Sequence, residues 1–129
     1  MAQVKIYGLA QHLDENREQI SEAIHASVMS AFEYPPEKKF HRFISLKNSD
    51  FVYPDDRSEA YTIIELSIFE GRSEQAKKAL IKTLFSNLEQ SVGITPQDIE
   101  ITIFETPKAN WGIRGKPGDE LALNYKVEV

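Results

Sequence analysis

The feature that most constrains the fold is an internal repeat, in which the second half of the chain repeats the hydrophobic pattern of the first. One constant shift in residue number places Val4 on Ile64 and Ile6 on Leu66, which belong to two short stretches of alternating apolar residues. The same shift superimposes three apolar positions at helical spacing: Ile20 on Leu80, Ile24 on Leu84 and Val28 on Leu88. Residue identity between the halves is low, so the repeat is one of pattern, and it indicates the same structural unit twice.

The first half predicts a strand, a helix and a second strand. The first strand covers residues 3–7 and ends at Gly8. Asp14 then caps a helix that runs to about Phe32, and a pair of prolines stops it. Residues 40–46 form the second strand.

The second half predicts the same three elements. Residues 61–69 form the clearest strand of the chain. Ser73 caps a helix that runs to Ser91 and is closed by a glycine, and the isoleucines of residues 99–103 mark the fourth strand. The tail is predicted to add a short extra strand over residues 121–127.

The order of these elements determines the fold class. A helix that joins two neighbouring strands makes them parallel, with a right-handed crossover. Two such units predict an α+β fold, with a four-stranded mixed sheet and both helices on one face. The chain is then one domain, made of repeat 1 (about 1–46), repeat 2 (about 61–105) and a C-terminal tail (106–129). The uncovered sheet face predicts self-association, and the alternative is a ferredoxin-like monomer whose open face meets solvent.

Charge and composition exclude several classes of protein. The net charge of −5 and the pI of about 5.2 argue against general binding to nucleic acid or membranes, which requires a basic surface. No apolar run approaches the roughly 18 residues of a membrane-spanning helix. The chain has no cysteine, which excludes disulfides and thiolate metal sites and suits a cytoplasmic protein.

Three stretches of the second half carry a family pattern. They are Ile68-Phe69-Glu70-Gly71-Arg72-Ser73, Gly93-Ile94-Thr95-Pro96-Gln97-Asp98-Ile99 and Asn110-Trp111-Gly112-Ile113-Arg114-Gly115. Together they resemble the tautomerase superfamily, in particular its 4-oxalocrotonate tautomerase-like and malonate semialdehyde decarboxylase-like branch. The resemblance implies a homotrimer with a tautomerase/MIF-like fold, an active site near the start of the first strand, and no cofactor or metal. In this superfamily an N-terminal proline acts as base toward keto and enol substrates, and arginines hold the substrate carboxylate.

The chain departs from the superfamily at its first residues. It reads Met1-Ala2-Gln3, and its first proline is Pro35. The primary amine of Met1 or Ala2 is therefore the candidate catalytic base. An α-amino group with a pKa of about 7.7–8.0 is partly neutral at pH 7, and it also forms Schiff bases with carbonyl compounds. The alternative is a chemically inert start to the first strand.

Four side chains are candidates for substrate binding. By the resemblance, Arg72 holds a substrate carboxylate, which a guanidinium matches with two parallel hydrogen bonds. The alternative is a surface arginine paired with a neighbouring glutamate. Arg114 is a second candidate anion contact and Trp111 a candidate apolar wall, unless both serve a trimer interface. Arg42 adds positive charge to the same site or is a solvated surface charge.

Two functions of different classes therefore remain open. One is a tautomerase-type enzyme that acts on a small keto or enol carboxylate in a pocket between subunits. The other is a non-catalytic trimer that kept the scaffold, lost the proline base, and binds a small acid or another protein.

Overall fold

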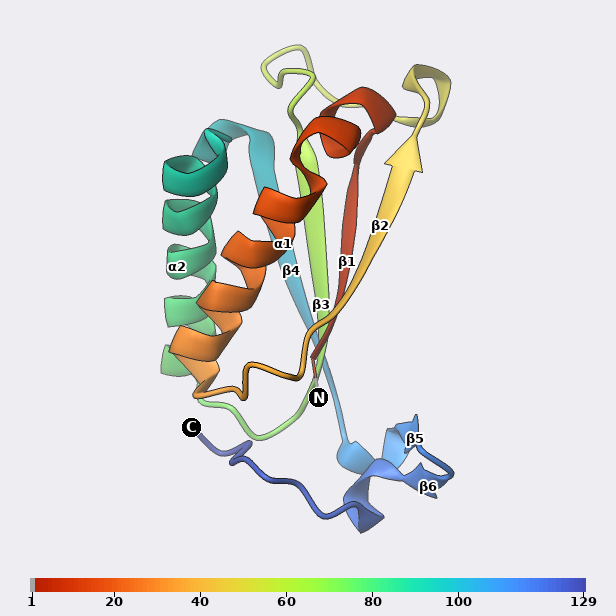
Figure 1. The fold of residues 1–129 in the computed structure, drawn as a ribbon, viewed down its shortest axis with the longest axis vertical. Coiled ribbons are helices and arrows are strands. Elements are labelled where there is room, and N and C mark those ends of the chain that lie inside the picture. The colour runs from red at the N-terminus through yellow and green to blue at the C-terminus, as the bar shows by residue number, and fades with distance from the viewer. Residues whose placement is uncertain (1) are drawn as a thin grey trace.

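The computed structural model describes residues 2–129 and shows a four-stranded sheet with two helices packed on one face (Figure 1). Its main elements are β1 (Ala2–Leu9), α1 (Ala10–Phe32), β2 (Phe40–Leu46), β3 (Thr62–Phe69), α2 (Glu74–Val92) and β4 (Ile99–Thr106). The strand order is β2-β1-β3-β4, with β1 parallel to β2, β3 parallel to β4, and β1 antiparallel to β3. The predicted α+β fold of two β-α-β units is therefore confirmed.

The internal repeat appears as a local twofold symmetry of the sheet. β1 begins at Ala2 and β3 at its repeat counterpart Thr62, and both strands have the same order of buried and half-buried residues. Their antiparallel register pairs Lys5 with Glu65, and Glu65 is also the residue that corresponds to Lys5 in the second repeat. The twofold axis therefore passes between β1 and β3 at this pair. The two ends of the sheet are thus equivalent positions built from different residues.

The core lies between the sheet and the helices. Strand alternation directs one face of β1 and β3 toward the helices, and five of its aliphatic residues are buried: Val4, Ile6, Ile64, Leu66 and Ile68. The helices pack against them with residues at helical spacing: Ile20, Ile24, Leu80, Leu84 and Leu88. Burial of each such side chain contributes roughly 1.5–3 kcal/mol, so these matched patterns hold the helices on this face.

α1 begins five residues earlier than predicted. It starts at Ala10, and its N-cap Leu9 makes no side-chain hydrogen bond, so Asp14 is not the cap. The prediction that Gly8 ends the strand was also wrong, because β1 continues past it. A Cβ on Gly8 would lie 3.1 Å from the side chain of Leu13. The glycine therefore lets the first turn of α1 pack directly against the end of β1.

α2 has the ends that the sequence predicts, to within one residue. Ser73 is its N-cap and accepts a hydrogen bond from the backbone N–H of Ala76 at 3.0 Å. Gly93 ends the helix in the left-handed conformation, with φ of 82°.

The predicted strand over residues 121–127 does not form. β4 is instead followed by a small hairpin of β5 (Gly112–Ile113) and β6 (Lys116–Pro117), which turns at residues 114–115. The chain then returns to the start of α2, where the N–H of Ser73 donates to the backbone oxygen of Val129 at 3.0 Å. Alternate apolar residues of this segment pack around Phe69 and Trp111 without strand pairing: Leu123, Tyr125 and Val127. The alternation thus reflects packing rather than a strand.

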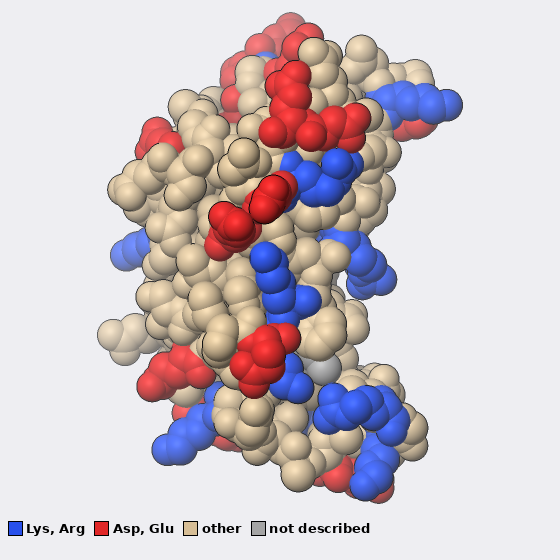
Figure 2. All heavy atoms as spheres, in the orientation of Figure 1, with Lys and Arg blue, Asp and Glu red and all other residues tan. Residues whose placement is uncertain are grey.

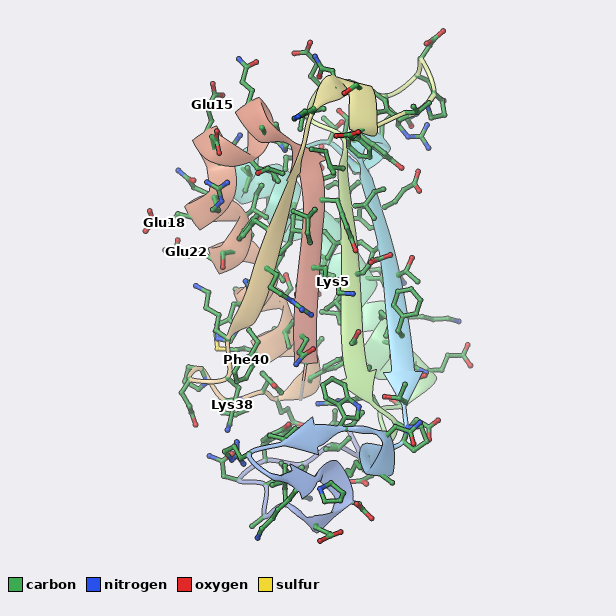
Figure 3. All side chains as sticks on the ribbon, turned by 90° about the vertical axis from the view of Figure 1, so that its right-hand side faces the viewer. Lys5, Glu15, Glu18, Glu22, Lys38 and Phe40 are labelled. Atoms are coloured by element: carbon green, nitrogen blue, oxygen red, sulfur yellow. The ribbon has the colours of Figure 1, made fainter. Side chains whose placement is uncertain are left out.

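The second face of the sheet is uncovered (Figure 3). Lys5 and Arg42 lie side by side on it in the register of β1 with β2. Phe40 and Phe104 lie on the two outer strands and are 42% and 49% exposed. The predicted open face is therefore present, and it carries both charged and apolar side chains.

Charged side chains are mixed over the helical side of the molecule. Figure 2 shows acidic and basic groups interspersed there, with basic side chains gathered at the end of the molecule that holds the β5–β6 hairpin. Arg114 and Lys116 are exposed on this hairpin. Within residues 2–129, no helix has the length and apolarity needed to cross a bilayer.

Candidate functional site

The start of β1 and the loop after β3 lie at the same end of the sheet. The antiparallel register pairs Ala2 with Ile68, close to the end of β3. Ala2 is buried, and its backbone nitrogen donates a hydrogen bond to the hydroxyl of Tyr34 at 3.0 Å. Tyr34 in turn interacts with Arg72. The first described residue and the predicted carboxylate-binding arginine are therefore joined through one tyrosine, while Met1 lies outside the described residues.

Arg72 is buried, with 4% of its surface exposed. Its guanidinium carbon lies 4.7 Å from the ring centroid of Phe32, and Nη1 donates to the backbone oxygen of Phe69 at 3.4 Å. Nε and Nη2 have no hydrogen-bond partner among residues 2–129. Burial lowers the pKa of Arg72, but a guanidinium starts from so high a pKa that it stays charged at neutral pH.

This geometry decides between the two interpretations of Arg72. A surface arginine paired with Glu70 or Glu74 is wrong, because Arg72 is buried and Glu74 pairs with Lys78 at 3.0 Å. The side chain instead carries a positive charge into the apolar end of the core. A buried charge of this kind is costly unless a partner balances it.

Two tyrosines surround this charge. The rings of Tyr34 and Tyr125 meet edge to face, with centroids 5.0 Å apart. Burial raises the pKa of both phenols, and interaction with Arg72 opposes the rise in each. Both hydroxyls are therefore protonated at neutral pH. They supply donors and acceptors beside the guanidinium.

Sequence reasoning missed both tyrosines. Tyr34 follows the end of α1 and precedes a pair of prolines, where the helical pattern no longer says which way a side chain points. Tyr125 lies in the tail, far from Arg72 in the sequence. The alternation of Leu123, Tyr125 and Val127 signals that one side of the tail is buried, but it does not say against what.

Trp111 lies at the same end of the molecule. Its ring packs edge-on against Phe69, with centroids 5.1 Å apart, and its Nε1 donates to Oγ1 of Thr106 at 2.7 Å. It belongs to the same apolar cluster as Tyr125 and Val127. The candidate role of Trp111 as an apolar wall is therefore compatible with its position.

Arg114 and Arg42 are not part of this cluster within one chain. Arg114 has φ of 49° at the turn of the β5–β6 hairpin and is exposed. Arg42 lies on the uncovered sheet face, in a shallow hollow with Lys5 and Tyr7. One chain therefore brings together Ala2, Arg72 and Trp111. The other two arginines remain on the surface.

The chemistry of the cluster favours an anion. Two buried N–H groups of Arg72 lack an acceptor in residues 2–129, and a buried unsatisfied donor costs about 1–3 kcal/mol, or more when it is charged. A carboxylate accepts two such donors in parallel. Within the described chain, no group of three or more His, Cys, Asp or Glu side chains is arranged to hold a metal.

The sequence has relatives among known proteins. The family model described as tautomerase enzyme matches residues 38–114. The 2-hydroxymuconate tautomerases of Comamonas testosteroni and Pseudomonas putida are 39% and 37% identical to this chain over 57 residues. Each match covers 44% of this chain and 90% of the relative.

Solved structures match the fold over nearly the whole chain. Malonate semialdehyde decarboxylase superposes with a TM-score of 0.81 at 25% identity, covering 92% of this chain and 99% of that chain. Native fused 4-OT superposes with a TM-score of 0.79 at 19% identity, covering 92% and 98%. The fold, the strand-to-helix junction that carries Arg72 and the family match agree, and the chain belongs to the tautomerase enzyme family.

Proposed function

We propose that this protein is a tautomerase-type enzyme, which binds the carboxylate of a small keto or enol acid at Arg72 and moves a proton with the amine of its first residue. The observation that carries the proposal is the buried guanidinium near Ala2, with two N–H groups that lack an acceptor among residues 2–129. A carboxylate satisfies both groups. Because water is excluded there, the attraction is stronger than at the surface.

The position of Ala2 supports the role of the amine. In a chain that begins at Ala2, the α-amino group takes the place of the backbone nitrogen that now donates to Tyr34 at 3.0 Å. Burial disfavours the charged ammonium, which favours the free amine that a base requires. The amine then takes the enol hydroxyl proton, and the resulting ammonium delivers a proton to the neighbouring carbon, which yields the keto acid.

We place the site at the boundary between subunits of a homotrimer. The uncovered sheet face exposes Phe40 and Phe104, and such a face is stabilised by contact with another copy of the chain. A fused 4-OT whose structure is an asymmetric trimer has a TM-score of 0.78 at 22% identity, over 91% of this chain and 96% of that chain. In such an assembly Arg42 and Arg114 approach the site from a neighbouring subunit. A sedimentation mass near three times 14.7 kDa supports this arrangement, and a mass near one chain contradicts it.

A ketonisation assay tests the chemistry. Phenylenolpyruvate is offered to protein prepared to begin at Ala2, to protein that keeps Met1, and to an Ala2→Pro variant prepared to begin at residue 2. We expect turnover above buffer for the first, less for the second, and the most for the proline variant, because a secondary amine is the stronger base. If neither the first preparation nor the proline variant exceeds buffer, the enzyme proposal is wrong.

The non-catalytic trimer is the second candidate, and two observations favour it. Tyr34 already hydrogen bonds the nitrogen of Ala2, and Tyr125 packs against Tyr34 where a substrate would approach. The sequence also has no proline before Pro35. Binding of phenylpyruvate without turnover of phenylenolpyruvate, in every preparation, would select this candidate.

A further inference from the structure

The two ends of the sheet are equivalent by the internal repeat, yet different segments of the chain cover them. The shift that relates β1 to β3 places His12 on Arg72 and Ala2 on Thr62. At the His12 end the two counterparts touch directly, since Nε2 of His12 lies 3.1 Å from Oγ1 of Thr62. The His12 end therefore serves as a comparison for the Arg72 end, because it is built from the equivalent segments of the other repeat.

The His12 end contains a hollow of about 430 Å³. Its lining comes from the end of β1 with the first turns of α1 (residues 9–15), from residues 46–48, and from residues 59–60. The repeat places the first two segments on residues 69–75 and 106–108 at the Arg72 end. A hollow of similar size is therefore expected beside Arg72.

That expected space is filled by residues 124–129, which we name the C-terminal strap. Val127 is 1% exposed and packs on Phe69, and its Cγ1 lies 3.0 Å from where a Cβ on Gly71 would stand. Tyr125 packs edge-to-face on Tyr34. The backbone oxygen of Val129 accepts the N–H of Ser73 at 3.0 Å. Repeat 1 has no counterpart of the strap, because its last strand leads directly into the loop before β3.

The strap is held in a way that permits release. It forms no strand or helix, and alternate side chains along it point to solvent: Asn124, Lys126 and Glu128. One of its side-chain links to the first repeat, from Asn124 to Glu37 at 3.3 Å, lies on the surface. Segments with few buried contacts and exposed backbone open most readily.

The strap interacts with Arg72 through Tyr125 but leaves part of the guanidinium without an acceptor. Nε and Nη2 of Arg72 remain without a hydrogen-bond partner among residues 2–129, although the side chain is buried. An incoming carboxylate gains charge-assisted hydrogen bonds at these two nitrogens. These hydrogen bonds to the guanidinium favour replacement of the strap by a carboxylate ligand.

We propose that the C-terminal strap is an autoinhibitory cover, which occupies the ligand's place beside Arg72 and must swing away before a small carboxylate binds. The inference rests on the proposed carboxylate site at Arg72. It adds that access to this site is controlled by the chain's own tail. Tyr125 and Val127 are the residues that close the site, and Gly71 is the point against which Val127 seats.

Chemical modification of arginine tests the cover directly. Phenylglyoxal is applied to the full-length protein, and the modification rate of each arginine is measured by peptide mass spectrometry. We expect Arg72 to react at least tenfold more slowly than Arg17, which is exposed on α1. In Tyr125→Ala and in Val127→Ala we expect that protection to fall to threefold or less. Lys126→Ala, a change in the same segment on its exposed side, is the matched control and should leave the protection unchanged.

A loosened fold is distinguished by a second arginine. Arg57 is held by Asp56 at 2.6 Å and by Glu100 at 3.0 Å, far along the chain from the strap. If the rate at Arg57 rises together with that at Arg72, the variant has opened globally. The decisive measurement is then hydrogen exchange of wild-type protein with and without phenylpyruvate, where the strap and the Ser73 amide are expected to exchange at least fivefold faster with ligand.

Two results overturn the proposal. One is equal reactivity of Arg72 and Arg17 in the wild-type protein. The other is a strap whose exchange does not change when phenylpyruvate binds. If Arg72 reacts fast and phenylpyruvate still binds, the proposed cover is wrong and the proposed carboxylate site stands. If Arg72 is protected in the wild type and reactive in the variants, but the protein never binds phenylpyruvate, the cover stands and the proposed ligand is wrong.

Discussion

The half-buried His41 should make the fold lose stability as the pH falls below neutral. Its Nδ1 lies 2.6 Å from Oγ of Ser21, and its ring meets the ring of His25 edge to face at 6.1 Å. Burial lowers the pKa of His41 from 6.5 to about 4, and the nearby charges of His25 and Lys39 act in the same direction. The folded chain therefore holds this ring neutral in a range where the unfolded chain protonates it.

The size and sign of the effect follow from these two pKa values. Between pH 6.5 and about 4 only the unfolded chain binds the proton, so the free energy of unfolding falls as pH falls through this window. The slope is at most about 1.4 kcal/mol per pH unit, which gives an upper limit of about 3 kcal/mol. Because the ring is only partly buried and solvent screens part of the effect, we expect about 2 kcal/mol.

Urea unfolding of two proteins isolates this contribution. The wild type is compared with His41→Asn between pH 7.5 and 4.5, because an asparagine keeps an acceptor for Ser21 and does not titrate. Ionisable groups that do not interact with residue 41 are common to both proteins, so their contributions cancel in the difference. The wild type should lose about 2 kcal/mol more than the variant over this range. Parallel curves, or a wild type that loses less than the variant, would refute the reasoning.

Three further substitutions should destabilise the fold by amounts that follow from the contacts, each measured by urea unfolding at pH 7.5. Leu84→Ala leaves a cavity under a fully buried position and should cost about 2–5 kcal/mol, and a cost below about 1 kcal/mol would contradict the packing. Ser73→Ala removes the side chain that caps α2 at 3.0 Å and should cost about 0.5–2 kcal/mol, whereas Ser91→Ala near the exposed end of the helix should change little. Asp98→Ala removes the acceptor of the Ser58 amide at 2.7 Å and should cost about 1–3 kcal/mol; an unchanged midpoint would show that water replaces it.

The fold was predictable because the strand alternation and the helical spacing of apolar residues recur at equivalent positions in the two halves. The alternation around Val4 and Ile64 and the helical stripes of the two halves impose the same unit twice, and the handedness of the crossover leaves few topologies. Local capping chemistry also predicted Ser73 correctly. Asp14 was mistaken for a cap because the strand-to-helix junction at Gly8 depends on close packing against Leu13, which no local pattern reports.

The candidate site was only half predictable. The family pattern around Arg72 points to an anion-binding arginine, and the structure shows that side chain buried near the start of β1. The environment of that charge depends on Tyr34 and Tyr125, which come from two distant segments and meet only in the folded chain. A contact between two such distant segments produces no periodic pattern in the sequence.

The central claim is that Arg72 binds a carboxylate, and calorimetric titration with phenylpyruvate tests it most directly. The wild type is compared with Arg72→Met, whose side chain has similar volume and no charge, so that the fold is expected to remain as stable or become more stable. Arg17→Met is the control, because Arg17 lies exposed on α1 and pairs with Asp14 at 3.0 Å. We expect Arg72→Met to weaken binding by at least about tenfold, since each hydrogen bond to a charged group is worth roughly 1.5–3 kcal/mol, and Arg17→Met to leave the Kd within twofold. Equal affinity of the wild type and Arg72→Met would contradict the account.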